Sequence, residues 1–422
     1  MDLRSGDPVW LADEPDDLSF PALRKNVRCD VAIIGAGISG ALIAHQLLES
    51  GLRVVVLDKR AVGRGSTAAS TGMLMYQTDT SLDDLTRLHG ASTARRVYQL
   101  GRRAIRELAA LTRTLRQPCG FLNKGTLYVA TKPTDVAPLK KEAARCRRLK
   151  LRADVVANRV LVRKFKIHRP AALASSGSAQ VNAFQLSRAV FRHHRSNPGL
   201  RIFQDSTVAA LSEDNVGTEL RLSTGRRVRA RYAIVAAGYE AGKFIQSDLV
   251  QLQSTYVIAS PPFPAGALWP AECLIWNTAR PYFYLRTTSD HRIVFGGCDE
   301  PFADPARRDK MLGEKTRQLE KQFADLFPAL AFRGEFAWTG TFAETRDGLP
   351  CIGSAYTGSR IFYALGYGGN GITFSQIAAR ILRDLCLEKS NADAALFRFD
   401  RFGHKPQPGS AIKNRGRRSA SG

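Results

Sequence analysis

The chain has 422 residues, of which 44% are hydrophobic, and its formal net charge at pH 7 is +24. A chain of this length can bury a large core in two domains, and this hydrophobic content is typical of a soluble globular protein. Seven cysteines are scattered without C-x-x-C spacing, which argues against a disulfide framework or a zinc site and predicts reduced thiols in a cytoplasmic protein.

The first segment, residues 1–27, is polar and contains six acidic residues but no long apolar run. We therefore expect a lead-in that wraps the surface, and we do not expect a signal peptide.

The stretch 29–40, CDVAIIGAGISG, predicts a buried strand, a tight turn and the first turn of a helix. Gly35, Gly37 and Gly40 form the pattern G-x-G-x-x-G. The first glycine allows the turn, the second lets the backbone approach a pyrophosphate, and the third lets the helix pack on the strand. The N–H groups at the helix start, at Ile38 and Ser39, would add a partial positive charge.

A second apolar strand, 54–57, ends in Asp58, where a carboxylate can bind the ribose of adenosine. Two other interpretations are weaker. Residues 31–48 could be a short membrane span, but three glycines, His45 and Gln46 argue against it. A βαβ unit without a ligand would not need three glycines at this spacing.

Further elements follow in order. We expect a glycine-rich loop over 61–78, a helix over 81–116, a hairpin around Lys124-Gly125 and a basic helix over 138–150. From 180 the pattern predicts a helix at 182–194, strands at 200–203, 206–211, 219–223 and 231–238, a strand-rich region at 251–300, and helices at 305–327. The last elements are a strand at 361–365, a glycine-rich turn at 366–371 and a helix over 372–387.

The positive charge is concentrated in two segments. Residues 138–170 contain twelve Lys or Arg against two acids, and residues 401–422 contain six and no acid. This excess could attract nucleic acid, an anionic membrane or an anionic partner. We favour a solvated basic face and a disordered tail, because few aromatics are interleaved with the charges and the tail is rich in Gly, Ser and Pro.

Four motifs together resemble the D-amino-acid-oxidase-like (DAO) family of FAD-dependent oxidoreductases: the G-x-G-x-x-G with its acid, RYAIVAAG at 231–238, TRDGLPCIG at 345–353, and IFYALGYGGNGITFS at 361–375. The resemblance implies an α/β fold in which a Rossmann-like FAD-binding domain is assembled from residues 1–80, 172–245 and 335–395. Residues 81–171 and 246–334 would form a substrate domain with a large antiparallel sheet.

The resemblance also implies which residues bind FAD, without a covalent bond. They are Gly35, Gly37, Ile38, Ser39, Gly40, Asp58, Lys59, Ser66, Thr67, Val208, Gly238, Gly366, Gly368, Gly369, Asn370 and Gly371. The glycine-rich turn that opens the last helix would offer N–H donors to the negative charge of a reduced flavin. No metal is expected.

The family implies oxidation of an amine or amino acid by hydride transfer to flavin N5, followed by hydrolysis of the imine. In the run 281–286, strand alternation puts Tyr282, Tyr284 and Arg286 on one face. This face could clamp a substrate carboxylate, or it could be an ordinary polar sheet face, and the sequence does not separate the two.

Departures from the family at three positions bear on which substrate the protein oxidises, how it holds the flavin and which electron acceptor it uses. Phe342 stands where glycine-oxidase-like relatives have a carboxylate-binding arginine, and Gly340 stands where sarcosine-oxidase-like relatives have the cysteine that holds flavin. Val294 stands where an oxygen-activating lysine is expected, with Arg292 two residues away on the same strand face. We therefore favour a dehydrogenase that passes electrons to a quinone or another carrier over an oxidase that uses oxygen.

Two other functions stay open. The same fold could act on a tRNA-linked substrate, which would use the positive charge, or it could be a catalytically silent flavin-binding subunit. Nucleic-acid binding is less expected than a small-molecule substrate.

Overall fold

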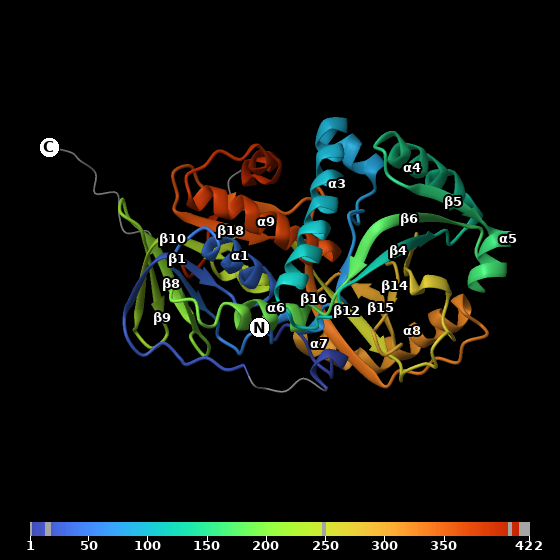
Figure 1. Ribbon diagram of the computed structural model, residues 1–422, viewed down its shortest axis with the longest axis horizontal. Coiled ribbons are helices and arrows are strands. Elements are labelled where there is room, and N and C mark those ends of the chain that lie inside the picture. The colour runs from blue at the N-terminus through green and yellow to red at the C-terminus, as the bar shows by residue number, and fades with distance from the viewer. Residues whose placement is uncertain (1, 13–17, 247–249, 404–406, 413–422) are drawn as a thin grey trace.

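The computed structural model describes residues 2–12, 18–246, 250–403 and 407–412, and it contains two large sheets that lie side by side (Figure 1). This mixed α/β architecture confirms the predicted fold class. Among the described residues, no helix is both long enough and apolar enough to cross a membrane.

The first sheet has a parallel core because its central strands are apolar throughout and are covered on both faces. Its order is β17-β18-β10-β1-β2-β7, and β8 and β9 extend it beside β10. The strands are β1 (Val27–Ile34), β2 (Val54–Leu57), β7 (Leu200–Phe203), β8 (Val208–Glu213), β9 (Thr218–Leu222), β10 (Arg227–Val235), β17 (Cys351–Ser354) and β18 (Ile361–Leu365).

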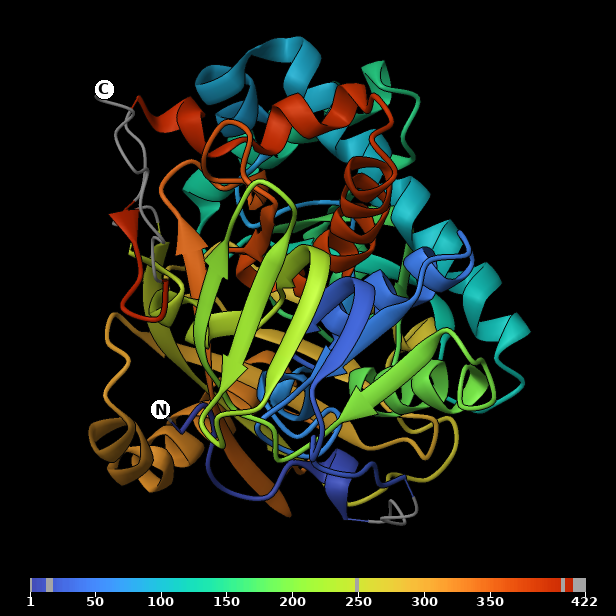
Figure 2. The same cartoon turned by 90° about the vertical axis from the view of Figure 1, so that its left-hand side faces the viewer.

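Alternate residues of β1 pack in opposite directions. Val31 and Ile33 lie in one buried cluster with helices α1 (Ile38–Leu48), α6 (Ala183–His193) and α9 (Gly371–Cys386). Ala32 and Ile34 lie in another cluster with β8 and β9. In Figure 2 this half of the molecule faces the viewer, with β8 and β9 drawn in yellow-green in front.

The second sheet has the order β16-β12-β15-β14-β13-β4-β6-β3, with β5 paired to β6. All of its pairs are antiparallel except β13 with β4. The strands are β3 (Met73–Leu74), β4 (Leu122–Val129), β5 (Ala153–Ala157), β6 (Ala171–Gln180), β12 (Val250–Ala259), β13 (Leu274–Asn277), β14 (Tyr284–Thr287), β15 (Ile293–Glu300) and β16 (Phe336–Thr345).

Helices cover the second sheet and join it to the first. They are α2 (Ser66–Ala69), α3 (Leu82–Thr114), α4 (Val136–Arg148), α5 (Asn158–Val160), α7 (Pro305–Lys310) and α8 (Leu312–Leu326). α3 stands between the two halves in Figure 1 and packs against both α9 and α4. It is kinked at Gly90, whose φ of +83° interrupts the helical backbone.

The expected hairpin around Lys124-Gly125 is wrong. Residues 122–129 form one strand, β4, whose pairing with β6 shifts between Lys124 and Thr126. The glycine that suggested a turn therefore marks an irregularity inside a strand.

Three strands pair in a different sheet from the one that the predicted segments suggest. β3, β6 and β16 belong to the second sheet, although residues 1–80, 172–245 and 335–395 were expected to build the FAD-binding domain. The chain thus passes between the two sheets more often than its motifs indicate, and the exact division into domains stays a prediction.

Both ends of the chain make more contacts with the rest of the protein than expected, where the structure describes them. The lead-in buries Leu3, Trp10, Leu18 and Leu23, so it is more than a surface wrap. Within 401–422, β19 (Gln407–Pro408) pairs with β11 (Ile245–Gln246), which contradicts disorder for that part. Residues 404–406 and 413–422 lie outside the described residues.

Candidate functional site

The glycine turn after β1 has no room for side chains at two of its three positions. A Cβ on Gly35, whose φ is +114°, would lie 2.3 Å from the carbonyl oxygen of Ala236. A Cβ on Gly40 would lie 1.9 Å from the carbonyl oxygen of Gly35, so the helix can pack this close to the strand only without one. Gly37 differs, because its Cβ would meet only the hydroxyl of Thr67, at 2.8 Å.

A cavity lies along this turn. Most of the predicted FAD-binding residues line it, including Gly35, Gly37, Ile38, Ser39, Asp58, Lys59, Ser66, Thr67, Val208, Gly238, Gly366 and Gly371. Gly40 supports the turn from behind, and Gly368 and Asn370 line a neighbouring cavity instead. The sequence motifs therefore come together in space although they lie up to 336 residues apart.

Two helix starts point at this cavity. Ser39 in the first turn of α1 and Ser375 in the first turns of α9 both line it, and their hydroxyl oxygens are 2.7 Å apart. The N–H of Ile38 donates to Thr67 Oγ1 at 2.9 Å, which ties α1 to α2. Both helices present the positive ends of their dipoles, which suits a ligand with a pyrophosphate and an anionic ring system.

The adenosine end of the cavity carries the predicted acid, Asp58. In this structure its carboxylate accepts hydrogen bonds from the N–H of Ala36 at 2.6 Å and of Arg60 at 2.8 Å. Burial raises the pKa of Asp58 above its ordinary value. Lys59 lines the same cavity and is paired with Glu240, a residue that the sequence motifs do not single out.

These residues fit FAD. The glycine turn forms a cradle without side chains, two helix starts converge on it, and the buried hydroxyl of Ser66 has no hydrogen-bond partner among the described residues. A dinucleotide cofactor supplies an acceptor for each of these donors.

A second cavity, of about 310 Å³, adjoins the first and shares Gly366 and Tyr367 with it. It lies beside the predicted flavin loop, and three carboxylates from distant parts of the chain line it: Asp79, Asp299 at the end of β15, and Glu344 in β16. Arg280 and Arg346 line it as well, and both are exposed. We name it the acidic cavity.

The three carboxyl groups of the acidic cavity have raised pKa values because they are buried. Asp79 accepts hydrogen bonds from the N–H of Gly369 at 2.7 Å and from the hydroxyl of Tyr282 at 3.0 Å, and burial raises its pKa. Burial raises the pKa of Asp299 to about 7, and burial together with Asp79 raises that of Glu344. A cation that enters the cavity would therefore stabilise the anionic form of each carboxyl group.

Of the three residues of the proposed carboxylate clamp, the two tyrosines stay in ring contact, with centroids 5.9 Å apart, and Arg286 is bound elsewhere. Tyr282 lines the acidic cavity, whereas the hydroxyl of Tyr284 lies 3.2 Å from Thr255 Oγ1. The guanidinium of Arg286 is buried, donates to the carbonyl oxygens of Val181 at 2.8 Å and Gly72 at 3.3 Å, and lies over the ring of Trp10. Burial lowers the pKa of Arg286 to about 9.

The residues near the expected oxygen-activating position are also placed. Val294 is fully buried in a cluster with Trp10 and Trp338 and pairs with Arg286 across the strands. Arg292 does not reach toward the flavin loop, because its guanidinium is bound to Asp290 and Glu335 at the sheet end.

Sequence reasoning missed Asp79, Asp299 and Glu344. None belongs to a recognisable motif, and more than 200 residues separate the first from the other two. Only the pairing of β12 with both β15 and β16 brings the last two to one side of a cavity.

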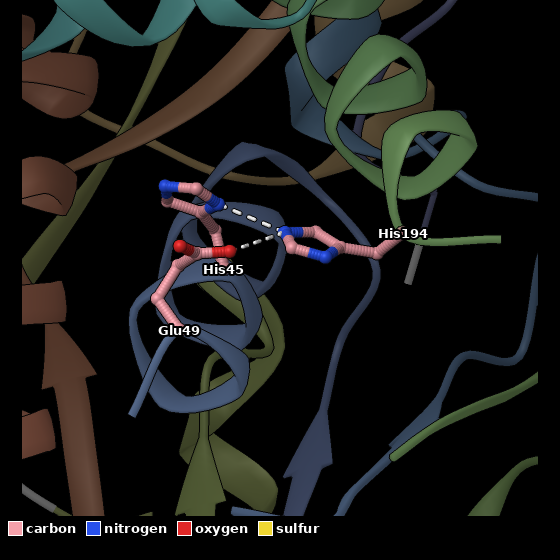
Figure 3. Close-up of side chains that lie close together, drawn as sticks. All are labelled: His45, Glu49 and His194. Carbon is pink, nitrogen blue, oxygen red and sulfur yellow. Dashed lines mark hydrogen bonds and ion pairs between the residues drawn. The ribbon is translucent and has the colours of Figure 1, made fainter. Parts of the chain in front are cut away.

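One further cluster of possible ligands lies between α1 and α6 (Figure 3). His45 Nδ1 and His194 Nε2 are 2.9 Å apart, and the carboxylate of Glu49 lies 4.0 Å from His194. Burial lowers the pKa of His194 to about 4, so the two rings can pair as neutral donor and acceptor. None of the three lines the cofactor cavity or the acidic cavity, and their contact joins the two helices.

Comparisons with known proteins agree with this geometry. The family model described as "FAD dependent oxidoreductase" (DAO) matches residues 30–385. The chain is 26% identical to the gamma-glutamylputrescine oxidoreductase of Escherichia coli over 410 residues, covering 92% of this chain and 90% of that protein. It is 24% identical to a glycine oxidase of Geobacillus kaustophilus over 392 residues, covering 89% and 97% of the two chains.

Solved structures share the fold. The crystal structure of that glycine oxidase superposes with a TM-score of 0.75 at 22% identity, covering 89% of this chain and 99% of the other. L-proline dehydrogenase from P. horikoshii gives a TM-score of 0.74 at 17% identity, covering 90% and 99%. The protein is therefore an enzyme of the FAD-dependent oxidoreductase (DAO) family, which binds FAD and acts on amine or amino-acid-type substrates.

Proposed function

We propose that this enzyme oxidises an amine that enters the acidic cavity as a cation. The observation that carries the proposal is the set of three carboxylates, Asp79, Asp299 and Glu344, beside the loop expected to face the flavin. Burial destabilises all three as anions, and a bound ammonium group would relieve this. A relative named for gamma-glutamylputrescine, which is an amine, supports the same substrate class.

A simple α-amino acid is a poorer fit. Its carboxylate needs a cationic partner in the cavity, and Arg286 has its guanidinium bound to two backbone carbonyls elsewhere. Phe342 stands where an arginine would be expected, and Arg280 and Arg346 lie at exposed positions. An anionic group on the substrate would therefore have to lie at the outer end of the acidic cavity.

The residues of the cavity suggest how the reaction proceeds. FAD, when bound, would supply the hydride acceptor for the carbon next to the amine nitrogen, and water would hydrolyse the imine formed from the substrate. A neutral amine gives up a hydride more readily than an ammonium ion. Asp299, whose pKa is about 7, would take the proton from the substrate, while hydrogen bonds from Tyr282 and the N–H of Gly369 partly offset the cost of burying Asp79 as an anion.

We further propose that the electron acceptor is a quinone or another carrier. Val294 offers no charge to a forming superoxide, and Arg292 is bound elsewhere. Stopped-flow mixing of substrate-reduced enzyme with air-saturated buffer tests this. We expect reoxidation slower than turnover with an artificial acceptor, and oxygen reduction as fast as turnover would contradict it.

An anaerobic panel of amines and of D- and L-amino acids tests the substrate class. We expect bleaching of the flavin absorbance by amines and not by glycine or D-alanine. Glu344→Gln should slow the bleaching of the flavin by amines and leave the spectrum of the oxidised flavin unchanged. Glu314→Gln, at an exposed position, is the control. Rapid bleaching by small amino acids and none by amines would contradict the proposal.

A further inference from the structure

We propose that a third cavity, next to the acidic cavity, binds a second ammonium group, so that the preferred substrate is a diamine or a longer polyamine. This inference rests on the proposed function. The cavity is lined by the aromatic rings of Tyr98, Tyr128, Trp276 and Tyr282 and by the carboxyl groups of Glu142 and Asp79. We name it the aromatic cavity.

The position of the aromatic cavity matches an extended substrate. It shares Asp79, Arg280 and Tyr282 with the acidic cavity, and the acidic cavity shares Gly366 and Tyr367 with the cofactor cavity. The three therefore follow one another from the flavin loop into the second half of the molecule. A chain whose reacting amine lies near the flavin would extend its other end toward Glu142.

Glu142 is the main reason to expect a cation there. It lies on the buried side of α4 and is only 9% exposed. Its Oε1 accepts hydrogen bonds from the N–H of Leu82 at 3.0 Å and the hydroxyl of Tyr98 at 3.2 Å, but its Oε2 is buried and has no partner. Among the described residues no ion pair includes Glu142. A buried carboxyl oxygen without a donor is a group that a ligand can satisfy.

The aromatic rings complete the proposed binding site for an ammonium group. Tyr128 and Trp276 meet edge to face, with ring centroids 5.2 Å apart, and Tyr282 lies on the side toward Asp79. Aromatic faces attract cations, and a carboxylate among them supplies the countercharge. The free volume of about 40 Å³ exceeds what one water needs, which suits a terminal aminomethyl group but not a large acyl group.

Among the residues that the structure describes, Arg280 is the one cation that lines this cavity. Its side chain is exposed, lies over the ring of Tyr282 at 5.4 Å and donates to the backbone oxygen of Asp79 at 3.3 Å. It therefore occupies the shared wall between the two cavities and leaves Oε2 of Glu142 unpaired. A substrate ammonium would take the inner position and Arg280 would stay at the outer one.

Three ligands that share a four-carbon chain test the inference on the holoenzyme: butylamine, 1,4-diaminobutane and N-acetyl-1,4-diaminobutane. We expect kcat/KM for the diamine to exceed that for butylamine by about tenfold to a hundredfold, the range for one charge-assisted pair. The acetylated diamine, which is neutral at its far end, should behave like butylamine.

Two variants locate the effect. Glu142→Gln keeps an oxygen for Leu82 and Tyr98 but removes the charge, and Trp276→Leu removes a ring while keeping an apolar wall. Each should lower kcat/KM for the diamine far more than kcat/KM for butylamine, so that the ratio of the two falls to about one. Asp154→Asn, an exposed acid in the same half of the molecule, is the control and should change neither value.

Equal kcat/KM for diamine and monoamine, or a preference that survives both variants, would overturn the inference. An acetylated diamine that is as good as the free diamine would do so too. If no amine reduces the flavin, the proposed function fails instead. Perturbation of the oxidised flavin spectrum by titration with diaminobutane and butylamine then still decides the subsite.

Discussion

Gly37 differs from the other two glycines of the cofactor turn in what an added Cβ would meet. Its Cβ would approach only the hydroxyl of Thr67, whereas Cβ atoms at Gly35 and Gly40 would collide with backbone oxygens. A substitution at Gly37 should therefore report on FAD binding, while one at either neighbour would report on folding.

We expect Gly37→Val to fold but to retain at least about tenfold less FAD per protein, because its methyl groups would fill space needed by the pyrophosphate. The flavin-to-protein absorbance ratio of the purified variant, together with circular dichroism, measures this. Gly242→Val is the control, since a Cβ there meets nothing within 4 Å.

In the wild type, acid should release all the flavin. A denatured chain that stays yellow would contradict non-covalent binding.

Arg286 is expected to act mainly through the fold. We expect Arg286→Ala to lower the free energy of unfolding by about 2–4 kcal/mol, because it leaves two buried carbonyl oxygens and a void beside Trp10. Chemical denaturation measures this, and exposed Arg227→Ala should cost little. Normal stability with a specific loss of carboxylate-bearing substrates would favour the clamp instead.

Asp299 should give the enzyme its pH dependence near neutrality. Because burial raises the folded-state pKa to about 7, the group is neutral below that pH and attracts a cation only above it. We expect kcat/KM for an amine to rise as the pH increases through about 7, and Asp299→Asn to lose this limb. Glu300→Gln, one residue on and paired with Lys315, should keep it. A limb that survives in the Asn variant would assign it to another group.

At the scale of elements, the segment 407–412 supports the adenosine side of the cofactor cavity. The N–H groups of Gly409 and Ala411 donate to the carbonyl oxygens of Phe244 and Lys243, at 3.1 and 2.8 Å. Both acceptor residues line the cofactor cavity. The end of the described chain therefore fixes a wall of the site from outside.

We expect a chain that ends at Gly403 to bind FAD about tenfold more weakly than one that ends at Ile412, because Lys243 and Phe244 lose their backbone partners. Fluorescence titration of the apoprotein with FAD compares the two. The full-length chain is the control, and the chain that ends at Ile412 should bind FAD as tightly as it does. Equal affinity in all three would show that the segment carries no part of the site.

At the scale of the whole molecule, much of the charge of +24 lies on exposed surface. The buried face of α4 carries Leu139, Ala143 and Cys146, while Lys140, Lys141, Arg147 and Arg148 are exposed. This is an amphipathic helix whose polar face happens to be basic. It lies outside the cofactor cavity and the acidic cavity.

We therefore expect any binding of tRNA to be electrostatic and to weaken by about 10³-fold or more between 50 and 200 mM salt, as for contacts to phosphates alone. Electrophoretic mobility shifts across a salt series measure this, and added tRNA should leave the turnover of amines unchanged. Tight binding that persists in high salt would favour the nucleic-acid interpretation.

The sequence by itself determined the cofactor and the family. The glycine spacing, the apolar strands and the final glycine-rich turn each act over a few residues, where backbone sterics and local hydrogen bonding decide the structure. Most of the FAD-binding positions inferred from them line one cavity. The sequence did less well where a local signal had two meanings, as at Gly125, which lies inside a strand.

Only the tertiary structure decided what lies beside the flavin. Strand alternation applies only from Tyr284, where β14 begins, so Tyr282 lies outside the strand. The packing brings Arg286 to backbone carbonyls and Tyr282 to a cavity. Asp299 and Glu344 meet because β12 pairs with both β15 and β16, and Asp79 joins them where it accepts from the N–H of Gly369. Contacts between residues so far apart depend on the packing of the whole chain, because no local pattern encodes them.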